Sequence, residues 1–342
     1  MRMVNKMVRG VLASLMVMIT GFSLAAADKE ITVLNRHDGV KLAGTLSVPD
    51  SVAPKAVVVM ATGSGQQNRD EEIMGHKPFK TIAGHLVANG YAVLRMDDRG
   101  IGGSIGNFAE STTDDFVRDI AAVVSFADSC FSELPVGVIG HSEGGTIAIR
   151  NAAHNPKCDF IVTLAAPAWS GDSVIMSQCR AMAVRMAGRW DGEALQRSLL
   201  DVAKSDMPDA QANMLIYMTL AQNLGETSKL PAVQQQMTAQ IKMLLSPWYR
   251  EMLRYDPSAD ISGINKPWLA LNGELDVQVL PENLSTVSEK NPGAITKLMS
   301  GHNHLFQRAK TGLIQEYAAI QEDVSPETLD VITKWLDGIF GR

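Results

Sequence analysis

The stretch Gly140-His141-Ser142-Glu143-Gly144 lies between a short apolar run, residues 136–139, and a run with helical spacing, residues 143–154. A G-x-S-x-G sequence at a strand-to-helix junction predicts a tight turn that presents the serine at the end of the strand. The positions two residues before and after the serine favour glycine, because a Cβ atom would not fit there. The pentapeptide alone is a weak signal, so its meaning depends on the surrounding sequence.

Short apolar runs alternate with helix-like segments on both sides of this motif. The pattern begins with a predicted hairpin, whose strands are 31–34 and 41–48. The alternation that follows is typical of a parallel α/β sheet with right-handed crossovers. The expected strands are 56–61, 91–96, 136–139, 159–164, 268–272 and 294–299, and the expected helices are 79–89, 113–127, 143–154, 281–289 and 326–340.

The alternation stops after Pro167, and no strand-like run appears between residue 169 and about residue 255. We therefore expect one α/β domain, formed by residues 28–167 and 259–342, with a helical cap inserted at 168–258. This segment is rich in methionine, which we expect mainly to fill its core. A sharper alternative is that some of these side chains line an apolar pocket beneath a mobile lid. The methionines are Met176, Met182, Met186, Met207, Met214, Met218, Met237, Met243 and Met252.

Composition narrows the range of partners. The net charge is -6 at pH 7 and no dense block of lysine and arginine occurs, so nucleic acid is not an expected partner. The three cysteines match no metal-ligand spacing, and we expect no metal and no organic cofactor. Cys130 and Cys158 lie beside apolar segments and are expected to be buried free thiols, with Cys179 as the third cysteine.

The first 27 residues have the pattern of a secretory signal peptide. Three basic residues within the first nine positions precede an uncharged run, 10–27, which ends in three alanines. We expect cleavage after Ala27, export of the mature protein, and no stable membrane partner after cleavage. An uncleaved membrane anchor is the alternative, since the uncharged run is at the lower limit for spanning a bilayer. The small residues at its end favour cleavage.

Four loops with candidate functional residues each follow a predicted strand. Because ligands bind at the carboxyl ends of the strands in an open parallel sheet, we expect these loops to meet at one edge. Their order of serine, acid and histidine is the order used by α/β-hydrolases. The spacing alone leaves the choice between two histidines open. In chain order the candidates are the loop 62–66, Ser142, Glu274 and Asp276, and His302 and His304.

Each candidate has a chemical role. Ser142 would be the nucleophile, and one of the histidines would accept its proton. Asp276 would orient that histidine; it lies further past the strand end than Glu274, which we expect to face solvent or to cap the loop. The backbone N–H groups of Ser64 and Glu143 would form the oxyanion hole, since residues 62–64 occupy the place of the usual His-Gly-X turn.

The other ionisable residues of the loops have simpler interpretations. Charged side chains directly after a strand more often hold a loop together than carry out chemistry. The remaining histidines are expected at the surface or in packing contacts, and His141 is expected to pack beside the turn. These residues are Asp97, Asp98 and Arg99 after one strand, and His37, His76, His85 and His141 elsewhere.

Several sequence blocks resemble the capped bacterial α/β-hydrolases of the serine-aminopeptidase-like and dienelactone-hydrolase-like groups, many of which are carboxylesterases. The resemblance covers nearly the whole chain after residue 27 and implies the α/β-hydrolase fold, with helices on both faces of a mostly parallel sheet. In such enzymes the histidine of the N-H-L-F-Q block is catalytic, which corresponds to His304. Family members often have proline after the position of Gly65, where this chain has Gln66. The blocks are GSGQQNRDE (63–71), GHKPF (75–79), AVLRMDDRGIGGS (92–104), GHSEGG (140–145), SPWYREMLRYDP (246–257), LALNGELDVQV (269–279) and NHLFQ (303–307).

Together, the residues and the resemblance predict an exported serine hydrolase that cleaves small carboxylic esters through an acyl-enzyme on Ser142. The expected partner is a small-molecule ester. Thioesterase and aminopeptidase activities use the same residues and remain alternatives. A binding protein with the same fold and no catalysis is a further alternative, because a fold does not fix a function.

Overall fold

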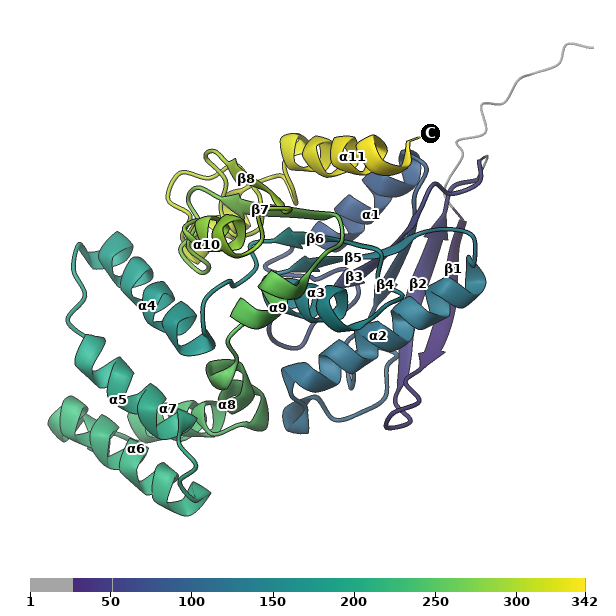
Figure 1. Ribbon diagram of the computed structural model, residues 1–342. Coiled ribbons are helices and arrows are strands. Elements are labelled where there is room, and N and C mark those ends of the chain that lie inside the picture. Colours follow the sequence, from purple (N-terminus) through teal and green to yellow (C-terminus); the bar gives the residue numbers. More distant parts are fainter. Residues whose placement is uncertain (1–26, 51, 342) are drawn as a thin grey trace, which may run out of the picture.

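An eight-stranded sheet forms the centre of the computed structural model, which describes residues 27–50 and 52–341 (Figure 1). The strand order is β1-β2-β4-β3-β5-β6-β7-β8. Strand β2 is antiparallel to both β1 and β4, and the other neighbouring pairs are parallel, so the predicted mostly parallel α/β sheet is confirmed. The strands are β1 (Ala27–Leu34), β2 (Lys41–Val48), β3 (Val57–Ala61), β4 (Ala92–Met96), β5 (Val136–His141), β6 (Phe160–Leu164), β7 (Trp268–Gly273) and β8 (Ile295–Met299).

Helices cover both faces of this sheet. One face packs against α2 (Thr113–Cys130), α3 (Glu143–His154), α9 (Ser258–Gly263) and α10 (Asn283–Lys290). The other face packs against α1 (Pro78–Ala88) and α11 (Pro326–Phe340). Every residue of the central strands β3 to β7 is buried, which explains why these strands read as continuous apolar runs.

Most predicted boundaries agree with the structure within two residues. Strand β1 begins four residues earlier than expected, because its backbone pairs with β2 along the full length of that strand. Helix α2 continues to Cys130, three residues past the expected end. The helix can extend because no glycine or proline lies between its expected end at residue 127 and Pro135. Its beginning is fixed by a capping box at Thr112 and Asp115.

Between β6 and β7 the chain forms only helices and short 3-10 turns. The helices α5 to α8 share a separate small core, which includes Leu199, Ile216, Ile241 and Leu253. In Figure 1 the helices α4 to α7 project away from one end of the sheet. The elements before α9 are α4 (Gly171–Ala187), α5 (Glu193–Lys204), α6 (Asp209–Leu224), η2 (Gly225–Lys229), α7 (Pro231–Leu244) and α8 (Pro247–Arg254).

The two ends of this helical insertion lie side by side. The backbone N–H of Gly171 donates a hydrogen bond to the carbonyl of Tyr255 at 3.0 Å. A Cβ atom on Gly171 would lie 1.8 Å from the carbonyl oxygen of Met252, so only glycine allows the helices α4 and α8 to approach this closely. The insertion therefore leaves and rejoins the core through a narrow stem.

The expectation that the methionines mainly fill the core of the insertion is wrong for four of them. Met237 is buried, whereas Met186, Met214, Met218 and Met243 are exposed. On α6 the buried side chains are Ala212, Ile216 and Leu220, which repeat every four residues and define the inner face. The two methionines of this helix lie off that face and therefore point outward.

The expectation of a buried free thiol is confirmed for Cys158 and wrong for Cys130. Cys158 is fully buried, and burial raises the pKa of its thiol to about 12, but Cys130 is exposed because α2 ends at the surface there. Within the described residues no disulfide forms, and no group of His, Cys, Asp and Glu side chains is arranged to hold a metal ion.

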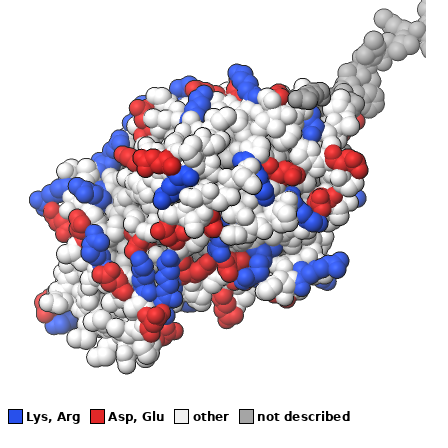
Figure 2. Space-filling view, viewed as in Figure 1, with Lys and Arg blue, Asp and Glu red and all other residues white. Residues whose placement is uncertain are grey.

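None of the helices described is both long and apolar enough to cross a bilayer. Acidic and basic side chains are interspersed on the face shown in Figure 2, without a block of one sign. The predicted signal peptide lies outside the described residues, apart from Ala27 in β1. Two further 3-10 turns are η1 (Phe108–Glu110), between β4 and α2, and η3 (Ile314–Ala319), between β8 and α11.

Candidate active site

Ser142 occupies the tight turn between β5 and α3. Its backbone has φ = 54° and ψ = -119°, an unusual conformation for a residue with a side chain that costs on the order of 1–3 kcal/mol. A Cβ on Gly140 would lie 1.9 Å from the carbonyl oxygen of Gly144, and a Cβ on Gly144 would lie 1.9 Å from that of Ala61. The two glycines are thus required by close backbone approach, as the G-x-S-x-G pattern predicts.

Asp276 and His304 form a buried pair. The Nδ1 atom of His304 lies 2.7 Å from Oδ2 of Asp276. The other carboxylate oxygen, Oδ1, accepts hydrogen bonds from the backbone N–H groups of Gln278 at 2.8 Å and Val279 at 3.0 Å. These backbone bonds fix the carboxylate, and the carboxylate in turn fixes the orientation of the imidazole ring.

The alternative acid and histidine have other partners. Glu274 accepts hydrogen bonds from the Ser300 hydroxyl and the Gly301 backbone, so it caps the loop; the hydrogen bond from Ser300 lowers the pKa of its exposed carboxyl. His302 is fully buried and bonds the Ser300 carbonyl and the Ser325 hydroxyl. The structure therefore brings His304, and not His302, to Asp276.

A cavity of about 330 Å³ joins these residues, since Ser142 and His304 both line it. In the described part of the chain no hydrogen bond links the two side chains directly; such contacts often tighten only when substrate binds. Most of the wall from the insertion is apolar or aromatic. Its apolar and aromatic side chains include Trp169, Val174, Ile175, Trp248, Tyr249 and Met252, and Gln178 is polar. Of the nine methionines of the insertion, Met252 alone is among the lining residues, so aromatic side chains shape this pocket.

Among the described residues, the backbone N–H groups of the two candidate oxyanion donors have no acceptor. The N–H of Gly63 is used, because it donates to Oε1 of Glu71 at 2.6 Å. Neither Ser64 nor Glu143 has an acceptor for its backbone N–H among the described residues. The N–H of Glu143 is free because this residue begins α3, and the first N–H groups of a helix lack partners within it.

Asp98 holds the loop that carries Ser64. Its carboxylate accepts hydrogen bonds from the Thr62 hydroxyl at 2.7 Å and from the backbone N–H of Gln67 at 3.0 Å. Burial raises the pKa of Asp98 to about 8, although these hydrogen bonds act in the opposite direction. Gly65, at φ = 96°, supplies the turn in this loop. The next residue is Gln66, at the position where family members often have proline. The departure at Gln66 is thus accommodated by a loop that is tied at both ends.

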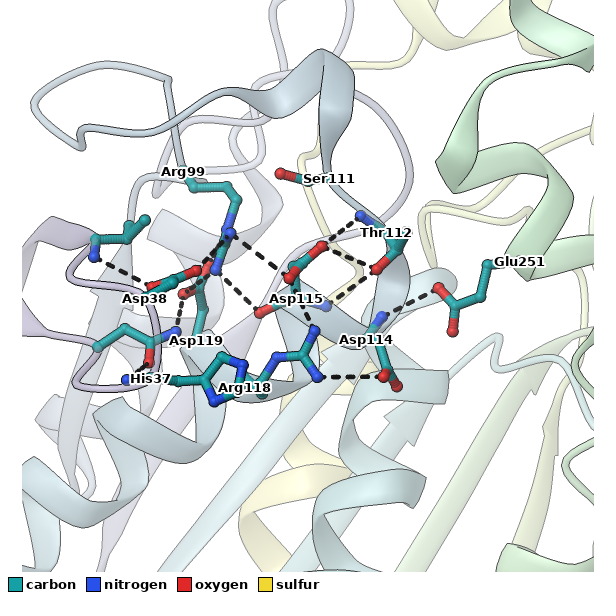
Figure 3. Close-up of polar contacts among 12 residues, drawn as sticks. His37, Asp38, Arg99, Ser111, Thr112, Asp114, Asp115, Arg118, Asp119 and Glu251 are labelled. Atoms are coloured by element: carbon teal, nitrogen blue, oxygen red, sulfur yellow. Dashed lines mark hydrogen bonds and ion pairs between the residues drawn. The ribbon is translucent and has the colours of Figure 1, made fainter.

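The neighbouring charges hold other loops. Asp97 pairs with Arg69 at 2.8 Å. Arg99 lies between Asp119 at 2.7 Å, Asp38 at 2.9 Å and Asp115, as Figure 3 shows. This network fastens the β1–β2 turn and the loop after β4 to the beginning of α2. The interpretation of these charged residues as structural is confirmed.

The family of the chain follows from its sequence. The profile of the family described as Serine aminopeptidase, S33 matches residues 53–253, more than half of the chain. The chain belongs to this family of α/β-hydrolases. The resemblance inferred from the motifs is thereby confirmed, and the matched segment includes Ser142 but ends before Asp276 and His304.

Individual relatives of this S33-family chain agree with that assignment. Esterase EstD of Thermotoga maritima is 29% identical over 45% of this chain and 35% of its own length. A monoglyceride lipase homolog of Monkeypox virus is 31% identical over 35% of this chain and 41% of its own length. The chain thus spans less than half the length of these curated relatives. Esterase Pf2001 of Pyrococcus furiosus shares the fold, with a TM-score of 0.58 at 17% identity over 92% of both chains.

The insertion of this S33-family chain contacts the turn through Glu143. One oxygen of its carboxyl accepts hydrogen bonds from the Thr113 hydroxyl at 2.6 Å and from Nε1 of Trp248, on α8, at 2.7 Å. Burial raises the pKa of this carboxyl. A second link joins α8 to the core, because Glu251 accepts from the backbone N–H of Asp114, as Figure 3 shows, and pairs with Arg150 at 3.1 Å.

Two residues at the site were not recognised from the sequence. His141 was expected only to pack beside the turn, but its Nδ1 lies 2.9 Å from Oε1 of Glu71 and its Nε2 lies 2.9 Å from the carbonyl oxygen of His304. Glu71 is buried as well. The only sequence feature that pointed to Glu71 was its place at the acidic end of the block GSGQQNRDE. Nothing in the sequence indicates that Glu71 turns back to contact Gly63 and His141.

Proposed function

We propose that this protein is a serine hydrolase that cleaves small carboxylic esters through an acyl-enzyme on Ser142. The observation that carries the proposal is that Ser142 and His304 line the same cavity. The backbone of Ser142 is strained, and the ring of His304 is oriented by its contact with Asp276. Free backbone N–H groups at Ser64 and Glu143 support it, because acyl transfer needs donors for a developing oxyanion.

In the proposed reaction Oγ of Ser142 attacks the ester carbonyl carbon while Nε2 of His304 accepts the hydroxyl proton. Asp276 stabilises the imidazolium that forms. The N–H groups of Ser64 and Glu143 donate to the oxyanion. When the tetrahedral intermediate collapses, the alcohol leaves with the proton from His304. Water then attacks the acyl-enzyme carbonyl with His304 as base, and the second tetrahedral intermediate releases the carboxylic acid while His304 returns the proton to Oγ of Ser142.

The pocket wall supports an apolar acyl or alcohol group of modest size. A cavity of about 330 Å³ lined by aromatic side chains fits such a group. The helices α4 and α8 supply much of this wall, so we assign the insertion the role of a cap that screens the site. Two relatives, an esterase and a monoglyceride lipase homolog, support ester substrates for this chain.

A fluorophosphonate probe tests the chemistry directly, since it labels an activated serine. We expect the protein to be labelled at Ser142, the S142A variant to be unlabelled, and H304A to lose labelling while H302A retains it. Absence of labelling in the unmodified protein would favour a binding protein with this fold. A series of p-nitrophenyl esters from acetate to octanoate, compared with thioesters and aminoacyl anilides, then separates esterase from thioesterase and aminopeptidase activity.

We also propose that the mature protein is exported, on the pattern of residues 1–27. A reporter fused after residue 30 should be found outside the cytoplasm and should lack the first 27 residues by mass spectrometry. A fusion that stays in the cytoplasm contradicts export, and an exported fusion that keeps these residues in the membrane fraction identifies an anchor.

A further inference from the structure

A buried bridge connects two parts of the proposed site that are distant in the sequence. At one end Oε1 of Glu71 accepts the N–H of Gly63, 2.6 Å away, directly before Ser64. At the other end Nε2 of His141 contacts the carbonyl oxygen of His304 at 2.9 Å. The link between the ends is the 2.9 Å contact from Nδ1 of His141 to Glu71.

The partners of His141 determine its protonation. With Glu71 ionised, its carboxylate and the backbone carbonyl of His304 are both acceptors, so both ring nitrogens of His141 donate, as only the imidazolium can. Burial alone lowers the pKa of His141, but the charge of Glu71 and its hydrogen bond more than offset this, and the pKa is raised. Among the described residues His141 is the one cationic partner of Glu71. The two residues thus form a buried ion pair.

The position of His304 explains why such a bridge is needed. Its loop follows β8, the strand at the edge of the sheet, whereas Ser142 follows β5, which lies three strands further in. The loop must therefore reach back across the ends of β7 and β6 to approach Ser142. His141, at the end of β5, contacts the backbone of this loop where it arrives, and the rings of His141 and His304 lie 4.7 Å apart.

We propose that Glu71 and His141 are positioning residues, which hold the oxyanion loop and the His304 loop at a fixed separation around Ser142. This inference rests on the proposed serine-hydrolase function. The bridge touches the backbone on both sides of the reacting atoms and touches neither Asp276 nor the Ser142 hydroxyl. Its loss should misplace the oxyanion donor and the base, lowering kcat with little change in KM.

The chain contains a matched control for this bridge. His76 is also buried, and its Nδ1 contacts a carboxylate, that of Asp323, at 3.1 Å. Its Nε2 contacts a backbone carbonyl, that of Tyr317, at 2.8 Å. Replacement of His76 therefore removes the same kinds of bond from a region that does not join the two loops. A purely structural role predicts the same result for both histidines.

The experiment compares H141Q, H141N and E71Q with H76Q in the full chain. The amide nitrogen of glutamine can replace Nε2 of His141, which contacts the carbonyl of His304. The amide nitrogen of asparagine can replace only Nδ1, which contacts Glu71. H141Q therefore still holds the His304 loop and should retain more activity than H141N. We expect kcat for p-nitrophenyl acetate to fall about 10- to 100-fold in E71Q and H141N, with KM within about threefold. H76Q should lower the melting temperature while changing kcat less than twofold. If a single variant fails to fold because one charge is left buried, the double variant E71Q/H141Q, which removes both charges, replaces it.

An activity-independent measurement separates this inference from the proposed function. The proton on Nδ1 of His304, bonded to Asp276, should give a low-field NMR signal that disappears in D276N. We expect E71Q and H141N to shift or broaden this signal and H76Q to leave it in place. An unchanged signal, together with unchanged kcat in E71Q and H141N, overturns the positioning role. Absence of fluorophosphonate labelling with a signal that does respond overturns the proposed function alone.

Discussion

The sheet core and the helical insertion differ in how tightly their residues are packed and in what they contribute to the site. In the core, every residue of the central strands is buried, and Ser142, Asp276 and His304 all follow core strands. The insertion has a smaller core and exposes large apolar side chains such as Met214 and Met218. It contributes only wall residues to the cavity. Under the proposed function, the buried core thus holds the reacting groups, and the more exposed insertion shapes the wall of the cavity beside them.

The largest effect should come from the core side of the site. D276N retains the shape of the side chain but removes the charge that orients and stabilises the imidazolium of His304, so kcat should fall about 10,000-fold. E274Q, which alters a loop-capping carboxylate on the same turn, should remain within about threefold of the unmodified protein. Steady-state kinetics with p-nitrophenyl acetate measures both. Equal losses would mean that the acid has been assigned incorrectly.

Packing substitutions should reveal whether the two regions unfold together. Ile216 in α6 and Ile139 in β5 are both completely buried, and truncation of either to alanine should cost about 2–5 kcal/mol. For I216A we expect faster hydrogen exchange confined to α5–α8, because those helices share their own core. I139A should increase exchange across the sheet. Faster exchange throughout the molecule in I216A would show that the insertion is not a separate cooperative unit.

A pH-dependent effect should arise from Asp98. Its pKa is raised from 3.8 to about 8, so the folded state holds a proton that the unfolded state has lost between these pH values. The free energy of unfolding should therefore fall as pH rises through this window, and the loss should be complete above pH 8. D98N, which cannot ionise, should flatten this slope. Urea unfolding of both proteins at several pH values measures it, and parallel slopes would contradict the raised pKa of Asp98.

The smallest effect should come from the contact between the two regions. W248F keeps the ring against the cavity but removes the hydrogen bond from α8 to Glu143, a loss of about 1 kcal/mol. KM for the longer esters should rise several-fold, while kcat for acetate changes little. Trp335 packs against the face of the sheet covered by α11, so W335F is a suitable control and should leave KM unchanged. A fall in kcat without a change in KM would place Trp248 in the chemistry.

Residues with local requirements were predictable from the sequence, and residues with distant partners were not. The turn at Ser142 demands glycines two residues away, and the buried strands demand unbroken apolar runs, so both appear as patterns along the chain. The order of the triad candidates followed from strand ends, but only resemblance chose His304 over His302. Glu71 lies 70 positions from His141, and no local pattern indicates such a contact. The outward methionines were misjudged because composition does not show which face of a helix is covered.

The stem at Gly171 and Tyr255 has a consequence for how this protein can change. Because the two ends of the insertion are joined by a backbone hydrogen bond, the sheet is connected there as if by a short loop, whatever length of chain lies beyond. The entropy of closing such a connection grows only slowly with its length. Lineages can therefore lengthen, shorten or exchange the segment beyond the stem while the strands beneath keep their pairing. The stem is accordingly the natural junction for chimeras that exchange the helical segments of related hydrolases.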